Sequence, residues 1–509
     1  MDKRDYLNIA ARGISFLINM VITFFVTSFV IRNVGAEAYG FVGLANDFIN
    51  YAQIIVIALN SMASRFVTLE IEKNDYIEVN KYCSSLFIMN AIVSVIISFF
   101  GTIIILNIDN LINVGHNILS DVQILWFFIL LNFIVTLIGT VFQISTFCKK
   151  RFDLEALRTT ESCILRAIVL LICYFFFKPF VWYVGMGTLC SSLYTLFFNI
   201  KYTKKLTPDI KIRTKYYSTE KIFVLLKAGI WNSVTQLGSV LSSGLDSLIT
   251  NLFVNSQFMG VLSVSKTIPS YLFNIISTST VVFAPDFIKY YSLGDTKRII
   301  EKLISSIKLL SFVTIIPLAT FVSIANLFYL IWVPNVDTNH LCTISLFIIT
   351  GYIFVMPVNA VWSIYTALNK IKISSIYLII ESMVNVLTEL IVIQFVTNNF
   401  YKVLVIVGIS TLLMIIRAVI FLPVYTSKCI GVDCNFFYIL YLKNLLIFSG
   451  IILVGRTITR LLNNSILSLF IGAIIIACFS TIVCYCLILN KDEKQYVFNC
   501  IKNKMKRGK

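Results

Sequence analysis

The sequence predicts an all-α, polytopic membrane protein. Hydrophobic residues make up 58% of the 509 residues and charged residues only 13%, and the mean hydropathy is +0.87. A soluble domain is about 45–50% apolar and about 25% charged, so most of this chain cannot face water. Continuous apolar stretches, such as 88–106, 124–147 and 466–490, have the length of about 20 residues that a spanning helix needs. Barrel strands would instead alternate in polarity over about 10 residues.

About fourteen spanning helices are predicted from these stretches. Their ranges are 10–32, 38–62, 82–107, 121–147, 157–178, 180–200, 222–252, 256–285, 301–332, 341–368, 373–396, 402–426, 439–461 and 465–490. They divide the chain into an N-terminal six-helix lobe (1–200), a basic cytoplasmic linker (201–221), a C-terminal six-helix lobe (222–426), helices 13 and 14 (427–490) and a basic cytoplasmic tail (491–509). Pro317 and Pro357 are expected to kink the ninth and tenth helices.

The positive charges follow the predicted topology. With both termini in the cytoplasm, 31 of the 42 Lys and Arg residues fall on the cytoplasmic side and five on the opposite side. The other six lie inside predicted helices: Arg12, Arg166, Lys227, Lys266, Arg417 and Lys443. This asymmetry supports an even number of helices, and it accounts for the net charge of +17 without a nucleic-acid partner.

The two six-helix lobes show signs of an internal repeat. At an offset of 220 residues, Tyr39-Gly40 aligns with Met259-Gly260, Asn46 with Lys266, Asn50 with Ser270 and Asp75 with Asp295. Each copy holds six helices, an even number, so the copies are expected to be parallel repeats related by an axis along the membrane normal.

The sequence contains none of the common catalytic motifs. HExxH, P-loop and GxSxG patterns are absent, so no enzymatic activity, cofactor or in-chain use of ATP is expected. The twelve cysteines include no CxxC pair, and the two histidines, His116 and His340, lie in predicted outer loops, so no histidine metal site is expected. A transport cycle would therefore draw on an ion gradient, the membrane potential or the substrate gradient.

Residues 34–43 carry a family resemblance. The stretch Val34-Gly35-Ala36-Glu37-Ala38-Tyr39-Gly40-Phe41-Val42-Gly43, which follows Arg32, resembles the turn between helices 1 and 2 in the polysaccharide branch of the multidrug/oligosaccharidyl-lipid/polysaccharide exporter superfamily. Ala11-Arg12-Gly13 and Ser64-Arg65-Phe66 are also similar to that branch, as is the arrangement of six, six and two helices. From the residues alone, Gly35, Gly40 and Gly43 are expected to allow a tight turn and close helix packing.

The resemblance implies a flippase for undecaprenyl-pyrophosphate-linked oligosaccharides in the bacterial cytoplasmic membrane, serving O-antigen or capsule synthesis by alternating access. Membrane lipids, a coupling cation (Na⁺ or H⁺) and polysaccharide polymerase machinery are the other implied partners. A drug/cation antiporter of the same fold, a lipid II flippase and a membrane polysaccharide polymerase are the alternatives. A polymerase normally needs a large outer loop, and the outer loops predicted here reach only about 14 residues, shorter than any domain.

Charged residues within spans are the candidate functional groups, because each is costly in lipid. Lys266 is a candidate anchor for the pyrophosphate, and Pro269 follows it about one helical turn later. Alternatively, Lys266 forms an ion pair with Asp47 or Asp246. Arg12 and Arg65, near the cytoplasmic ends of helices 1 and 2, could receive the anionic headgroup or contact lipid phosphates. Asp47 and Asp246 could instead hold the coupling cation.

Two further charged sets lie within predicted helices, and the second of them is expected to be structural. Glu161 and Arg166 lie about 140° apart around one helix axis and should not face each other. Glu381 and Glu389 share one helix face, and Arg417 on the next helix could pair with either.

Overall fold

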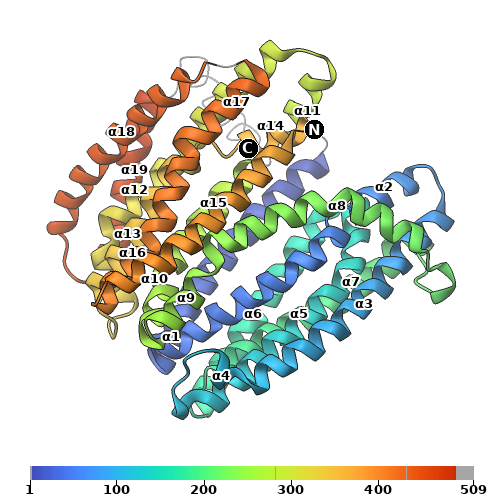
Figure 1. Cartoon of the computed structure of the whole chain (residues 1–509), viewed down its shortest axis with the longest axis horizontal. Coiled ribbons are helices and arrows are strands. Elements are labelled where there is room, and N and C mark those ends of the chain that lie inside the picture. The colour runs from blue at the N-terminus through green and yellow to red at the C-terminus, as the bar shows by residue number, and fades with distance from the viewer. Residues whose placement is uncertain (1–2, 281–282, 369, 432, 489–509) are drawn as a thin grey trace. The chain divides into compact units, whose positions relative to one another are not determined.

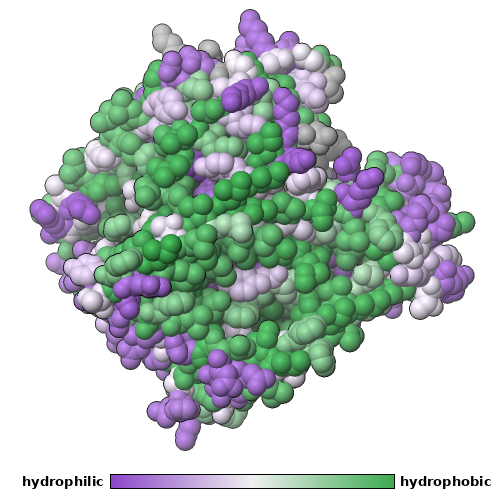
Figure 2. Space-filling view, in the orientation of Figure 1, coloured by the Kyte–Doolittle hydropathy of each residue, from purple (hydrophilic) through white to green (hydrophobic). Residues whose placement is uncertain are grey.

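The computed structural model describes residues 3–280, 283–368, 370–431 and 433–488. All of the regular elements in these ranges are helices, which confirms the predicted all-α membrane fold (Figure 1). Ten of the described helical segments are long and apolar enough to cross a membrane. On the face shown in Figure 2, hydrophobic residues cover most of the exposed helix sides and hydrophilic residues gather near the margins, as expected for surfaces that face lipid.

A helix lies in each of the fourteen predicted ranges, but the number that cross the membrane stays a prediction. The first candidate span, Ile18–Glu72, joins two predicted helices. The helices within 180–200, 222–252 and 256–285 do not pass the same test of length and apolarity. The predicted helix 341–368 is interrupted at 356–360, so Pro357 ends a helix where a kink was expected.

The helices form two compact units. The first comprises Met1–Val264 and Ser375–Leu390, and the second comprises Ser265–Ser374 and Ile391–Lys509. The first unit holds α1 (Lys3–Asn60), α2 (Ala63–Glu72), α3 (Tyr76–Leu106), α4 (Ile108–Leu111), η1 (His116–Ile118), α5 (Leu119–Cys148), α6 (Phe152–Phe176), α7 (Trp182–Leu206), η2 (Thr214–Tyr216), α8 (Thr219–Ser239), the π-helical segment η3 (Val240–Gly244) and α9 (Asp246–Phe253).

The second unit holds α11 (Ala284–Ser292), α12 (Thr296–Trp332), α13 (Thr338–Val355), α14 (Val361–Ala367), η5 (Ile393–Phe395), α16 (Asn399–Ile416), the π-helical segment η6 (Arg417–Phe421), α17 (Leu422–Ile430), α18 (Asn435–Arg460) and α19 (Ile466–Leu487). α10 (Ser256–Thr280) and α15 (Ile371–Val392) each contribute residues to both units.

Glycines shape the predicted turn between the first two helices, as expected. Gly35 has φ 84° and ψ 163°, a conformation that residues with a Cβ rarely adopt, and it forms the kink between the two helical parts of α1. Gly40 packs against the backbone of α10, since a Cβ at Gly40 would lie 2.7 Å from the Cα of Gly260. Gly43 similarly faces Ser263, whose hydroxyl would lie 3.0 Å from an added Cβ. The glycines of this motif therefore let α1 and α10 approach closely.

In the first unit, segments predicted near one side of the membrane meet at one end of the helices. Asn113, from a predicted outer loop, and Asn251, at the outer end of the predicted helix 222–252, exchange hydrogen bonds of 2.7 and 3.1 Å. At the predicted cytoplasmic end, Lys211 N–H donates to Asn80 at 2.6 Å and Lys221 forms an ion pair with Glu78 at 2.6 Å. The hydrogen bond from the Lys221 ammonium to Glu78 raises the pKa of Lys221, so this side chain stays charged at neutral pH. The back-and-forth order of the predicted helices is therefore consistent with the packing.

The second unit shows the same grouping. The His340 ring stacks on Phe400 with 3.9 Å between centroids, which joins two predicted outer segments. At the other end, Tyr425 donates to the carbonyl of Lys370 at 2.7 Å, which joins the cytoplasmic end of the predicted helix 402–426 to a predicted cytoplasmic segment. The segments predicted to lie on one side again lie together.

The local structure at two equivalent positions supports the internal repeat. Asp75 caps α3 by accepting from the Glu78 N–H at 3.0 Å, and Asp295 caps α12 by accepting from the Arg298 N–H at 3.0 Å. The two caps have nearly the same backbone angles, φ −88° and ψ 78° against φ −90° and ψ 78°. A positive φ precedes each aspartate, at Asn74 and Gly294, 220 residues apart like the caps. Each turn therefore starts a long helix in the same way.

Candidate functional site

Asp47 and Asp246 come together in the first unit around a tyrosine. Asp47 is half-buried on α1, and Tyr51 follows one helical turn later. Asp246 is the first residue of α9 and is 3% exposed. Both carboxylates lie within electrostatic range of the Tyr51 hydroxyl. This hydroxyl donates to the carbonyl of Gly244 at 2.6 Å, at the end of the π-helical segment η3. We call Asp47, Tyr51 and Asp246 the acidic cluster.

The acidic cluster adjoins an irregular part of the helix. A π-helical turn is wider than an α-helical turn, and such segments are frequent at functional sites. The Tyr51 hydrogen bond satisfies a carbonyl at this turn and so fixes α1 to the end of η3, just before α9. Two carboxylates and a hydroxyl are oxygen ligands suited to a hard cation, and the carboxylates could also take up protons.

Lys266 is half-buried on the part of α10 that belongs to the second unit. Pro269 has no N–H, so it cannot bond to the carbonyl four residues earlier, that of Ser265. In place of that bond, the Ser345 hydroxyl donates to the Ser265 carbonyl at 2.9 Å, and the Tyr329 hydroxyl lies 3.5 Å from the same oxygen. The residue next to Lys266 is thus anchored to α12 and α13, which restricts where the ammonium can lie.

Of the two arginines predicted to receive the headgroup, the structure describes the side chain of one. Arg12 belongs to α1, but its side chain is outside the described residues. Arg65 is exposed on α2, next to Ser64, which lines a cavity of about 220 Å³. Glu155 and Gln143 also line this cavity, at the predicted cytoplasmic end of the first unit. Arg65 is therefore accessible near a polar recess.

A buried amide pair adjoins the same cavity. Asn60 and Asn90 exchange amide hydrogen bonds of 3.1 and 3.0 Å, and Thr140 donates to Asn60 at 2.9 Å. Asn90 is fully buried and also donates to the Leu137 carbonyl at 3.1 Å. These bonds satisfy polar groups that would otherwise be costly inside the protein, and they hold α1, α3 and α5 together.

Glu161 and Arg166 have separate partners, as predicted. Glu161 accepts from Tyr194 at 2.6 Å and pairs with Arg158. Arg166 donates to the Thr23 hydroxyl at 3.0 Å. Both residues thus take part in helix packing within the first unit.

The predicted pairing of Arg417 with Glu381 or Glu389 stays a prediction. Glu381 and Glu389 are buried on the part of α15 that belongs to the first unit, and Asn385 donates to Glu389 at 2.8 Å. Arg417 is 9% exposed at the start of η6, in the second unit.

Three contributors to these sites were missed from the sequence. Tyr51 could have been found because it lies four residues after Asp47 and so shares its helix face. Ser345 and Tyr329 carry no such signal, since they lie 80 and 64 residues from Ser265. Among the described residues, no group of three or more His, Cys, Asp or Glu side chains could hold a metal ion.

Comparison with known proteins identifies relatives over most of the chain. Residues 7–290 match the model of a family described as polysaccharide biosynthesis protein. An uncharacterized membrane protein, EpsK of Bacillus subtilis (strain 168), is 26% identical over 437 residues, which cover 84% of this chain and 83% of EpsK.

Solved structures share the fold. One described as the lipid II flippase MurJ in an inward closed conformation matches with a TM-score of 0.68 and 17% identity, covering 94% of this chain and 98% of that one. An inward-facing multidrug resistance MATE family transporter of the MOP superfamily matches with a TM-score of 0.66 and 15% identity, covering 82% of this chain and 99% of that one.

Proposed function

Because this chain belongs to the polysaccharide biosynthesis protein family, within the multidrug/oligosaccharidyl-lipid/polysaccharide exporter superfamily, we propose that it is a flippase for undecaprenyl-pyrophosphate-linked oligosaccharide repeat units. It works by alternating access in the bacterial cytoplasmic membrane, with both termini in the cytoplasm, and serves the synthesis of a surface polysaccharide such as O-antigen or capsule. The residues 1–200 and 222–426 act as its two lobes.

The half-buried Lys266 is the observation that carries the choice of an anionic substrate. A lysine ammonium is a suitable point charge for a phosphate group. A charged side chain within the membrane costs free energy, so its presence there indicates a function. In the proposed cycle Lys266 holds the pyrophosphate, and Arg12 and Arg65 receive the headgroup at the cytoplasmic side. A drug/cation antiporter would be served better by a site without this lysine.

The proposed function predicts where the lipid-linked intermediate accumulates when the gene is deleted. Complete repeat units on the polyprenyl carrier should build up on the cytoplasmic leaflet, because their synthesis continues while their export stops. Mass spectrometry of extracted carrier lipids, with a leaflet-specific probe, measures this directly.

Other outcomes would contradict the proposal. Normal pools on both leaflets with altered dye efflux would indicate an antiporter. Repeat units that accumulate on the outer leaflet would indicate a polymerase. Arrest of cell-wall growth with accumulated lipid II would indicate a lipid II flippase. The plasmid-borne parent gene, which should restore the normal distribution, is the control.

The acidic cluster is proposed to couple transport to a cation. In proteoliposomes under a Na⁺ or H⁺ gradient, Asp246→Asn should lower the gradient-driven rate by about tenfold, the effect of about 1.4 kcal/mol on one step. Tyr51→Phe should give a smaller loss, because it removes the bond to Gly244 but keeps both carboxylates. Asp109→Asn changes an exposed carboxylate and is the matched control. If Asp246→Asn responds to the gradient as the parent does, the cluster does not couple transport.

A further inference from the structure

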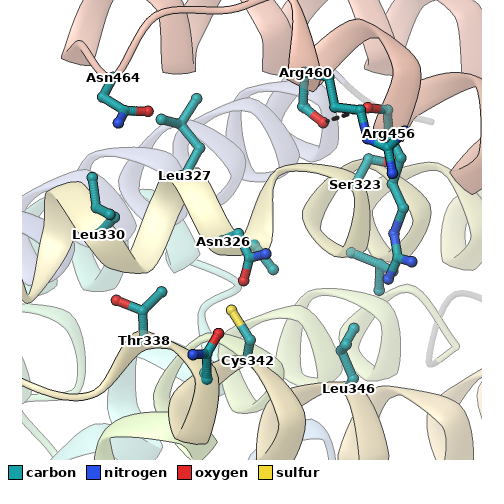
Figure 3. Close-up of a pocket in the computed structure, with 14 residues that line it drawn as sticks. Ser323, Asn326, Leu327, Leu330, Thr338, Cys342, Leu346, Arg456, Arg460 and Asn464 are labelled. Carbon is teal, nitrogen blue, oxygen red and sulfur yellow. Dashed lines mark hydrogen bonds between the residues drawn. The ribbon is translucent and has the colours of Figure 1, made fainter.

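The second unit contains a pocket of about 620 Å³ that the proposed transport residues do not use. Its lining comes from α12, α13, the last turns of α18 and the loop before α19 (Figure 3). Asn326 of α12 and Cys342 of α13 point toward one another across it. It is larger than the cavity beside Ser64, which measures about 220 Å³.

The pocket lies where four candidate spans begin or end. α12 ends at Trp332 and α13 begins at Thr338, while α18 ends at Arg460 and α19 begins at Ile466. The ends of spanning helices lie at the level of the lipid headgroups. The pocket therefore opens at a membrane interface, which the predicted topology makes the outer one.

The polar part of the lining favours an anion. Arg456 and Arg460 lie one turn apart on α18, and both are exposed. Arg456 is also within electrostatic range of the Cys342 thiol on α13, so its charge acts on the interior of the pocket. Amide side chains come from Asn326 and Asn464. None of the described lining residues is acidic, and guanidinium groups bind phosphate through paired hydrogen bonds.

The apolar part of the lining favours a lipid over a small free anion. Leu327, Leu330 and Leu346 line the pocket together with the arginines and asparagines. A phospholipid presents the same two chemistries, a phosphate and the start of an acyl chain, side by side. A free phosphate ion would leave the leucines without a partner.

The pocket is built on closely packed helices. A Cβ added at Gly455 of α18 would lie 2.6 Å from the Cβ of Ser323 on α12. α18 and α12 are therefore in near-backbone contact beside the pocket, which keeps Arg456 in register with α12. Because the helices of the pocket are already held together, they lose little conformational freedom when a ligand binds.

From these observations we propose that the pocket binds the phosphate headgroup of an anionic phospholipid at the membrane interface, with Arg456 and Arg460 as the phosphate ligands and the leucines against the glycerol and acyl carbons. This lipid site is distinct from the residues proposed to carry the transported substrate. It does not depend on which oligosaccharide the protein moves.

Native mass spectrometry of the full-length protein tests the site, with phosphatidylglycerol and phosphatidylcholine offered in competition. The parent protein should retain phosphatidylglycerol preferentially. Arg456→Gln/Arg460→Gln should weaken that binding by about tenfold or more, since it removes both guanidinium groups that would form charge-assisted hydrogen bonds with the phosphate. Asn326→Trp should weaken it as well, because the ring fills the pocket while both arginines remain.

Lys178→Gln/Lys402→Gln is the matched control. It removes two positive charges from the same predicted side of the membrane, and neither lysine lines the pocket. Equal losses in this variant and in the arginine variant would show a general surface attraction, and they would overturn the site. Unchanged phosphatidylglycerol retention in Asn326→Trp would also overturn it. Inorganic phosphate that displaces the lipid at millimolar concentration would assign the pocket to a free anion instead.

Discussion

Gly260→Ala is expected to destabilise the protein strongly, because the added methyl group has no room against the backbone of α1. A Cβ at Gly260 would lie 2.6 Å from the carbonyl carbon of Ala36 and 2.8 Å from the Cα of Glu37. Both are backbone atoms, which cannot rotate away as a side chain could. Overpacking of this kind costs about 1–3 kcal/mol, or more where nothing yields. Size-exclusion chromatography after heating should show aggregation several degrees below the parent protein.

Gly450→Ala is the matched control for this prediction. Gly450 also lies inside a spanning helix, α18, but a Cβ there would meet nothing within 4 Å. It should keep the melting temperature of the parent or raise it, since alanine favours a helix over glycine by about 1 kcal/mol. If Gly260→Ala is as stable as Gly450→Ala, α1 and α10 cannot be packed as closely as described.

The helices could be predicted because hydropathy over about 20 residues depends on composition alone. The glycine turn could be predicted as well, because Gly35, Gly40 and Gly43 fall where a turn between two spans was needed. That Gly40 meets Gly260 depends on tertiary packing, although the two positions are 220 residues apart, the offset of the repeat. The repeat indicated their equivalence but gave no reason to place them in contact.

Three of the prolines in predicted spans show why helix ends were harder to predict. Pro269 and Pro317 remain inside α10 and α12, whereas the chain leaves the helix around Pro357. A proline inside a helix frees the carbonyl four residues earlier, and a donor from a neighbouring helix can satisfy that oxygen. For Pro269 this donor is the hydroxyl of Ser345, 80 residues from Ser265, which no local pattern indicates.

The residues of the candidate site also differ in whether the sequence could identify them. Asp47, Asp246 and Lys266 could be selected individually, because a charge within a span is conspicuous in an apolar sequence. Tyr51, which brings the two carboxylates into one cluster, is an ordinary residue in such a helix and gains its role only from the fold.

Lys266→Gln is expected to abolish most transport while leaving the protein folded. Glutamine keeps a polar side chain of similar length but removes the charge that would hold the pyrophosphate. Losing one charge-assisted hydrogen bond costs about 1.5–3 kcal/mol, so undecaprenyl pyrophosphate should bind about 10- to 100-fold more weakly. Surface polysaccharide in a complemented deletion strain should fall close to the level of the deletion, and binding to the purified variant is measured in parallel.

Lys227→Gln and Lys266→Arg separate this role from a structural one. Lys227 is an exposed lysine on α8, also within a predicted span, so its replacement controls for the loss of a membrane-embedded charge and should preserve transport. Lys266→Arg keeps the charge and should retain most of the binding. If Lys266→Gln melts well below the parent, and Lys266→Arg restores its melting temperature but not its transport, the charge serves an ion pair. Transport at the parent rate in Lys266→Gln would exclude Lys266 as the pyrophosphate anchor.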